Sequence, residues 1–208
     1  GSLTHFSLEE GYWLILSGAD ELNIESCGAP MNDIAYDLDE GANLISYPSS
    51  ISRDLSMAIP DDVEDLFEAI LTAGEAAMNT DIGWVGSISE FVGSTGYWVV
   101  VSADLSFSYD FDSEDDGLGR EELGLSKPAF GRLPNDKNYH AMQSSEQAFY
   151  FVDSIELLDG DMDISEDYYI LSYNGKDVTG ARLWQGDGTM IDIPVMGQDG
   201  NKYSENYI

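Results

Sequence analysis

Apolar and polar residues alternate along much of the chain, and this alternation predicts β-strands. Residues 34–38 and 42–48 alternate on either side of a turn at residues 39–41, and a second pair of strands is expected from Tyr97 onward. Four strands are predicted near the C-terminus, at residues 147–158, 168–173, 178–184 and 190–196. Asn174-Gly175 lies between the middle two and is typical of a tight hairpin. Strands at this spacing are typical of a β-sandwich.

One segment has a different period. Its apolar residues recur at i, i+3, i+4, i+7 and i+8, which places them on one face of a helix. They are Val63, Leu66, Phe67, Ile70 and Leu71. Asp61, Asp62 and Glu64 lie where negative charge favours the start of a helix. The pattern therefore predicts a packed amphipathic helix through residue 71, weakened or ended at Gly74 and followed at residues 76–78 by a frayed helical turn.

An internal repeat organises the first half of the chain. Residues 1–13 return as residues 86–98, and both copies match G-S-x-x-x-F-x-x-x-x-G-Y-W without gaps. The residues that follow, 14–17 and 99–102, agree in kind, so each copy is interpreted as part of a β-hairpin. A repeat of this length indicates a module duplicated in tandem. The alignment implies that the chain begins halfway through such a module.

The repeat and the breaks between strands divide the chain into four parts. We expect the C-terminal half of a repeat module at 1–29, a complete β-rich module with one helix at 30–111, an acidic linker at 112–132 and a β-sandwich-like domain at 133–208. The predicted fold is mainly β, with tandem β-rich modules followed by the sandwich-like domain. Residues 203–208 are interpreted as an unfinished strand, so both ends fall within β pattern.

Charge narrows the possible partners. Forty acidic residues against eight basic ones give a net charge of −32, which repels nucleic acid and anionic lipid surfaces. No apolar run approaches the roughly 18 residues that a membrane helix requires, so membrane insertion is not expected. Such charge opposes compaction unless salt or bound cations neutralise it, which indicates high ionic strength, calcium, or both. A plain solvated acidic surface explains the charge equally well.

Two acidic loops are candidate calcium sites. The first places Asp110, Asp112, Glu114 and Asp116 at alternate positions before a glycine, and the second contains Asp159, Asp161 and Asp163. Closely spaced carboxylates in a tight loop can direct several oxygens at one hard cation. Neither loop is an EF-hand, because Leu123 and Ile164 occupy positions where that loop requires glutamate and glycine. Further acidic turns occur at Asp187 and Asp199, and plain solvated turns remain the alternative for all of these loops.

Aromatic residues suggest a second kind of ligand. The tryptophans and neighbouring tyrosines could stack on sugar rings, although core packing is favoured for each of them. They are Trp13, Trp84, Trp98 and Trp184. In Tyr12-Trp13 and Tyr97-Trp98, neighbouring side chains on a strand point to opposite faces, so one ring of each pair is expected inside.

Catalysis has the least support. His5 and His140 fall in different modules, no G-x-S-x-G motif occurs, and no histidine cluster could hold zinc. The number of carboxylates is no evidence for a glycosidase, because some pair among forty will always lie at a suitable separation. Cys27 is the single cysteine, so no internal disulfide forms, and a buried thiol is favoured over a nucleophile.

Several motifs resemble those of a known group of proteins. The segments 41–48, 83–87 and 96–98 look like modules of large secreted surface proteins of marine bacteria, which often carry C-terminal sorting domains. The tail is similar to companion domains of those proteins, in the segments 147–151, 173–175, 180–184 and 194–200. The resemblance implies an extracellular modular protein. It carries no activity onto particular residues, because its motifs consist of glycines and aromatic residues.

These patterns together predict a non-enzymatic protein of the cell surface or extracellular space. It is expected to assemble through β-strand complementation with other subunits or with neighbouring modules, stabilised by calcium and able to form a fibre. A carbohydrate-binding accessory module of a secreted hydrolase, with glycans as partners, is the alternative.

Overall fold

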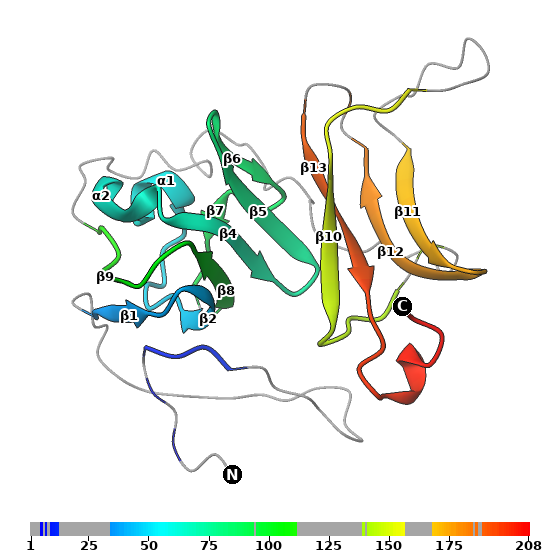
Figure 1. Cartoon of the computed structure of the whole chain (residues 1–208), viewed down its shortest axis with the longest axis horizontal. Helices are drawn as coiled ribbons and strands as arrows, with labels where there is room; N and C mark the ends of the chain where they lie inside the picture. Colours follow the sequence, from blue (N-terminus) through cyan, green and yellow to red (C-terminus); the bar gives the residue numbers. More distant parts are fainter. Residues whose placement is uncertain are drawn as a thin grey trace. The chain divides into compact units, whose positions relative to one another are not determined.

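The computed structural model describes a mainly β protein (Figure 1). The described residues are 5, 7, 9–12, 34–93, 95–111, 139, 141–156, 168–184, 186 and 189–208. The chain divides into two compact units. Unit 1 comprises residues 1–72 and 90–113, and unit 2 comprises residues 73–89 and 114–208. The module boundaries inferred from the sequence stay a prediction. They were drawn from the internal repeat, whereas the two units are defined by which residues lie close together in space.

A bent antiparallel ribbon forms the centre of unit 1. Strand β1 (Tyr36–Leu38) pairs with β9 (Leu105–Phe107), and β2 (Gly41–Ser46) pairs with β8 (Gly96–Val101). The ribbon bends between β1 and β2 on one side and between β8 and β9 on the other. There the Glu40 N–H donates to Asp104 Oδ1 at 2.8 Å. Strands β1 and β2 confirm the strands that the alternating residues predict at 34–38 and 42–48. The expected hairpin between residues 97–101 and 105–107 is wrong, because β8 and β9 each pair with a strand from the preceding segment instead.

The predicted amphipathic helix is also wrong beyond its first turn. Helix α2 spans Asp61–Glu64, and the chain then enters strand β4 (Phe67–Thr72), which pairs with β8. Between Phe67 and Ala69 the register shifts, so Glu68 is an additional residue on the β4 side. Phe67 and Ile70 lie opposite Val101 and Val99, and all four side chains are buried. A β-bulge therefore places inward-facing residues three apart and imitates the spacing of a helix.

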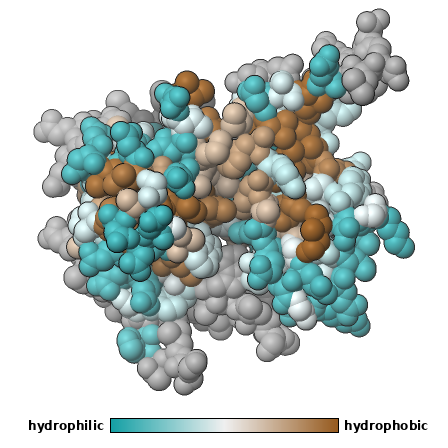
Figure 2. Space-filling model, viewed as in Figure 1, coloured by the Kyte–Doolittle hydropathy of each residue, from teal (hydrophilic) through white to brown (hydrophobic). Residues whose placement is uncertain are grey.

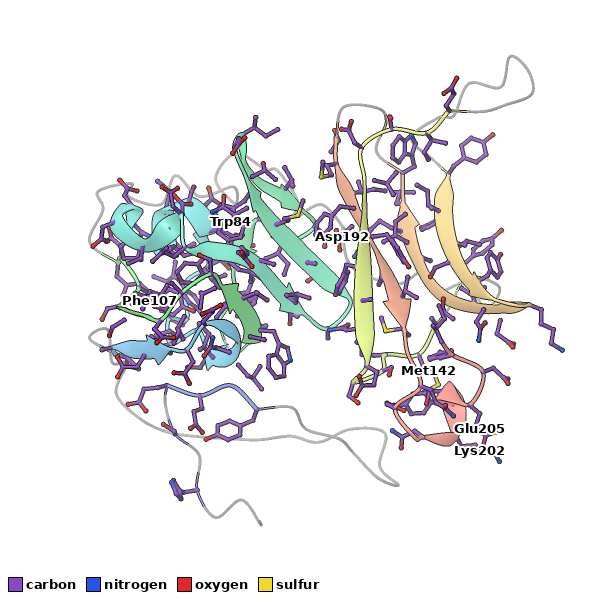
Figure 3. All side chains as sticks on the ribbon, in the orientation of Figure 1. Trp84, Phe107, Met142, Asp192, Lys202 and Glu205 are labelled. Carbon is purple, nitrogen blue, oxygen red and sulfur yellow. The ribbon has the colours of Figure 1, made fainter. Side chains whose placement is uncertain are left out.

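Short elements complete unit 1. Strand β3 (Arg53–Asp54) pairs with β7 (Glu90–Phe91), and helix α1 (Leu55–Ala58) follows β3. Unit 1 has an aromatic core centred on Tyr109. Four rings surround it edge-on, with centroids between 5.0 and 5.3 Å from that of Tyr109, and they belong to Tyr36, Tyr47, Phe91 and Phe107. Phe107 lies within this crowded group of side chains in Figure 3. Burial raises the pKa of Tyr109 well above its usual value, so this phenol stays neutral and donates its hydroxyl hydrogen to Ser46 O.

The described part of unit 2 is built from three antiparallel strand pairs. Strands β5 (Glu75–Thr80) and β6 (Gly83–Gly86) form a hairpin. Strand β10 (Gln147–Val152) pairs with β13 (Ile191–Met196), and β11 (Tyr169–Asn174) pairs with β12 (Asp177–Leu183). Gly175 has φ +62° in the turn between β11 and β12, which confirms the hairpin predicted there. Residues 76–78, expected to be a frayed helical turn, are extended in β5.

Close backbone approach holds the two C-terminal pairs together. A Cβ atom on Gly180 of β12 would lie 1.8 Å from the carbonyl oxygen of Pro194 on β13, so only glycine fits there. Every residue of β13 is buried, and Trp184 packs with Ile191 and Ile193 in the core of this unit. On the face shown in Figure 2, hydrophobic residues gather over these strands, and hydrophilic residues cover the C-terminal turn.

The last residues do not form a strand. A 3-10 helix, η1, spans Lys202–Ser204, and the Gln198 N–H donates to the carbonyl oxygen of Ile208 at 2.9 Å. The side-chain amide of Asn174 donates to the carbonyl oxygens of Asn206 and Tyr207. The interpretation of residues 203–208 as an unfinished strand is therefore wrong, because these residues fold back onto unit 2. No helix in the described part of the chain is long and apolar enough to cross a membrane.

Candidate functional site

The predicted calcium loops lie almost wholly outside the described residues. Asp112, Glu114 and Asp116 of the first loop and Asp159, Asp161 and Asp163 of the second are not among them. Asp110 is described, and it follows β9 with its N–H donating to the carbonyl oxygen of Ala58 at 2.8 Å. Within the described ranges, no three His, Cys, Asp or Glu side chains are grouped as metal ligands would be. Calcium binding by these loops thus stays a prediction.

The acidic turn at Asp199 can be described, and its carboxylate is occupied by donors from the protein. Ser204 Oγ and Tyr203 Oη donate to it at 2.6 and 2.7 Å, and the N–H groups of Asn201 and Ser145 do so at 3.1 and 3.3 Å. Burial acts to raise the pKa of Asp199, but the hydrogen bonds from Ser204, Tyr203 and Asn201 outweigh it and hold that pKa well below its usual range. This turn is a structural anchor for η1.

A buried ion pair lies at the centre of unit 2. Arg182 of β12 and Asp192 of β13 are 4% and 0% exposed, and Arg182 Nη2 lies 2.6 Å from Asp192 Oδ2. Arg182 also donates from Nε to the carbonyl oxygen of Asp192 and from Nη2 to that of Gly74. Asp192 lies on the side of β13 that faces the β5–β6 hairpin (Figure 3).

The second copy of the repeat contributes to this pair. The Ala76 N–H and the Ser87 hydroxyl both donate to Asp192 Oδ2 at 3.0 Å, and Ser87 belongs to the Gly-Ser that opens the repeat. Burial raises the pKa of Asp192, while Arg182 acts in the opposite direction. Ala76 and Ser87 thus attach residues 73–89 to Asp192 of β13, and Arg182 binds the same residue from β12. The other oxygen, Asp192 Oδ1, is buried and has no hydrogen-bond partner among the residues that the structure describes.

The same hydrogen bond occurs in both repeat copies. In the second copy, the Val92 N–H donates to Tyr97 Oη at 2.8 Å. In the first copy, the Ser7 N–H donates to Tyr12 Oη at 2.7 Å. Ser7 and Tyr12 occupy the same motif positions as Val92 and Tyr97. The repeated sequence therefore makes this hydrogen bond in both copies, from the backbone of the preceding segment to the tyrosine of G-Y-W.

The first copy lies against strand β2. Glu10 forms an antiparallel bridge with Ile45, and the Gly11 N–H donates to the carbonyl oxygen of Leu44 at 3.0 Å. The opposite edge of β2 is bonded to β8, whose first residue is Gly96 of the second copy. A Cβ atom on Gly11 would lie 2.7 Å from the Ile45 carbonyl oxygen, so the approach requires glycine. We call residues 9–12 the donor segment and this side of β2 the acceptor edge.

The aromatic residues divide between core and surface. Tyr97 is 2% exposed and Trp98 is 37% exposed, which confirms for this pair that one ring faces inward. Trp184 is buried, Trp84 is half-buried, and Trp13 lies outside the described residues. Tyrosines rather than tryptophans supply most of the exposed aromatic surface in the described part of unit 2. Among them, Tyr139 and Tyr169 are stacked with centroids 6.0 Å apart. The number of tyrosines in this part of the sequence was a possible signal for an exposed aromatic surface, but their spacing does not show which of them are exposed.

His5 is exposed, whereas Cys27 and His140 lie outside the described residues. Comparison with known proteins gives no family for the chain. No protein-family model matches the sequence, and neither a curated protein nor a solved structure is significantly similar to it.

Proposed function

We propose that this chain is a non-enzymatic structural or adhesive protein of the extracellular space or cell surface, which assembles through β-strand complementation. In this proposal the first half consists of tandem β-rich modules and the C-terminal part is a sandwich-like domain. The observation that carries it is the addition of the donor segment to the acceptor edge of β2. A segment of one repeat copy there is hydrogen-bonded to the edge of a sheet that contains the other copy.

Contacts of this kind suit assembly because they are not symmetric. The donor segment and the acceptor edge are different surfaces, so joining one chain to the next by this contact leaves a free donor at one end and a free acceptor at the other. Such head-to-tail contacts build open filaments unless the rotation between subunits happens to close a ring. The proposed product is therefore a fibre.

Calcium has a place in this proposal because of charge. Subunits with a net charge of −32 repel each other, and this repulsion falls only when salt screens the charges or cations bind them. The acidic loops containing Asp110 and Asp159 are the proposed calcium ligands.

Light scattering coupled to size-exclusion chromatography tests assembly directly. The full chain is measured over a range of concentrations in calcium, in magnesium at matched ionic strength, and after EDTA. We expect species larger than one chain that grow with concentration in calcium and disappear in EDTA. Equal assembly in calcium and magnesium would support screening in place of a specific site, and a single chain in every condition would contradict the proposal.

A carbohydrate-binding accessory module is the second candidate, and one observation favours it. The exposed tyrosines of unit 2 include the stacked pair Tyr139 and Tyr169, and exposed aromatic faces are suited to sugar rings. Charge favours neutral or cationic glycans over acidic ones. Pull-down on insoluble glycans, lost in Tyr169→Ala but kept in the exposed control Tyr150→Ala, would support this candidate over assembly.

A further inference from the structure

The donor segment binds β2 through backbone atoms, in a way that does not depend on its belonging to the same chain. The bridge between Glu10 and Ile45 and the bond from the Gly11 N–H to Leu44 O involve main-chain atoms. An identical segment of another copy would offer the same donor, the same acceptor and the same glycine. Exchange of identical elements between protomers has a small cost in free energy, because each hydrogen bond broken within a chain is replaced by an equal one between chains.

Glycine at the motif position shared by both copies makes this contact selective. A Cβ at position 11 would approach the Ile45 carbonyl oxygen to 2.7 Å and Leu44 Cγ to 2.9 Å, which is closer than packed atoms allow. At position 96, a Cβ would lie 3.7 Å from Gly11 Cα, which is an ordinary van der Waals distance. The close fit of Gly11 on β2 excludes most extended peptides, so a segment of this repeat is the matching ligand.

Only the first copy is placed to exchange. The equivalent residues of the second copy, from Gly96 onward, belong to β8, which is bonded to β2 on one side and to β4 on the other. Removing β8 would break both ladders and expose Val99 and Val101, which are buried. Among the described residues, releasing the donor segment breaks the bridge between Glu10 and Ile45 and the hydrogen bond from the Gly11 N–H to Leu44 O, and Glu10 is already exposed.

We infer that the acceptor edge of β2 binds the donor segment of a second copy of this chain, so that the joint between subunits is an exchanged strand. This inference rests on the proposed function and specifies its joint. The partner is recognised by its Glu-Gly-Tyr backbone, with Gly11 against Ile45 and the Tyr12 hydroxyl accepting from the Ser7 N–H. Binding within one chain and binding between chains then compete, and higher protein concentration favours the exchanged form.

Cross-linking between two differently marked chains tests the joint. In a Cys27→Ser background, one chain carries Glu10→Cys and a second, isotopically heavier chain carries Ile45→Cys. Directly opposite residues of a non-hydrogen-bonded antiparallel pair lie about 4.5 Å apart at Cα, which is within the range that a disulfide spans. Mixed under mild oxidation, they are expected to form the heavy-light dimer at least about tenfold faster than either chain forms a dimer alone.

A second test does not depend on cysteine at the buried position 45. A synthetic peptide of residues 5–12 competes with the donor segments for the acceptor edge, so an excess of it is expected to reduce assembly of the unmodified chain at least about tenfold. The same peptide with Gly11→Ala is the matched control and should leave assembly within about twofold, because its Cβ would clash with the Ile45 carbonyl oxygen.

The outcomes separate this inference from the proposed function. Fast heavy-light cross-linking together with selective inhibition by the peptide that keeps Gly11 supports the exchanged strand. Assembly of the unmodified chain without preferential cross-linking, or with the two peptides behaving alike, overturns the joint but leaves assembly intact. A chain that never assembles overturns both.

Discussion

At the scale of single residues, Asp199 shows how a carboxylate that resembles a calcium ligand can serve the fold instead. Its oxygens accept hydrogen bonds from Ser145, Asn201, Tyr203 and Ser204, which tie η1 to the segment before β10. These donors compete with a cation for the same lone pairs. An acidic residue beside glycine is therefore insufficient evidence for a metal site in this chain.

The depressed pKa of Asp199 predicts a pH dependence with a definite sign. A carboxyl group whose pKa is lower in the folded state stabilises the fold above its unfolded pKa of about 3.9, and this contribution disappears as pH falls through the folded value. We expect Asp199→Ala to lower the urea midpoint at pH 7, and this difference from the unmodified chain to be smaller near pH 2, where part of the contribution has been lost. Asp153→Ala, at an exposed aspartate of the same unit, is the control. An equal loss at both pH values would contradict the role of the charged carboxylate.

The buried ion pair of Arg182 and Asp192 predicts a larger loss of stability than the removal of Asp199, because breaking the pair leaves a buried charge without its partner. Removing one charge leaves the other buried and unpaired, and breaking such pairs costs about 3–5 kcal/mol. We expect Arg182→Met to destabilise unit 2 by this order, and the Arg182→Met/Asp192→Asn double variant to recover part of it. Urea unfolding of the four proteins in the double-mutant cycle measures the coupling. Additive effects of the two substitutions would show that the ion pair is not what joins these strands.

At the scale of elements, the β-bulge in β4 explains the main error of the sequence interpretation. Glu68 is the additional residue, and removing it leaves Phe67, Ala69 and Ile70 opposite Val101, Val100 and Val99 as in a regular ladder. Deleting Glu68 is therefore expected to keep the fold. Deleting Val100 shifts β8 by one residue and exchanges its buried and exposed faces, so it is expected to unfold unit 1. Near-ultraviolet circular dichroism distinguishes these outcomes, and loss of the tertiary signal in the Glu68 deletion would contradict the bulge.

Strands could be predicted from the sequence where alternation was regular and turns were marked. The β11–β12 hairpin was recognisable because Asn174-Gly175 is a local signal, and β13 because its residues are apolar except for Asp192. Pairing was not predictable for β8 and β9, since antiparallel partners far apart in sequence leave no local mark. Strand β4 was not predictable either. Its one additional residue, Glu68, changes the two-residue period of inward-facing side chains into an apparent helical period.

The candidate site was less predictable than the fold. The repeat itself was evident, but its two copies take different places, with Gly96 inside a sheet and Gly11 outside β2. The pattern of the motif is the same in both copies, so only the structure distinguishes them. Arg182 and Asp192 are ten residues apart on separate strands, and nothing in their local sequence indicates that they meet.

At the scale of the whole molecule, the charge of the chain and its strand contacts act in opposite directions. A net charge of −32 keeps copies apart, while the acceptor edge and donor segment offer hydrogen bonds between them. Assembly is therefore expected to depend on cations and on protein concentration.

Negative-stain electron microscopy of the purified full chain tests this central claim most directly. Grids prepared at high protein concentration in calcium, and again after EDTA, show both the presence and the symmetry of any assembly. We predict filaments in calcium that disperse in EDTA, because a head-to-tail strand contact does not close upon itself. Separate single chains under both conditions, or closed two-fold dimers in calcium, would contradict it.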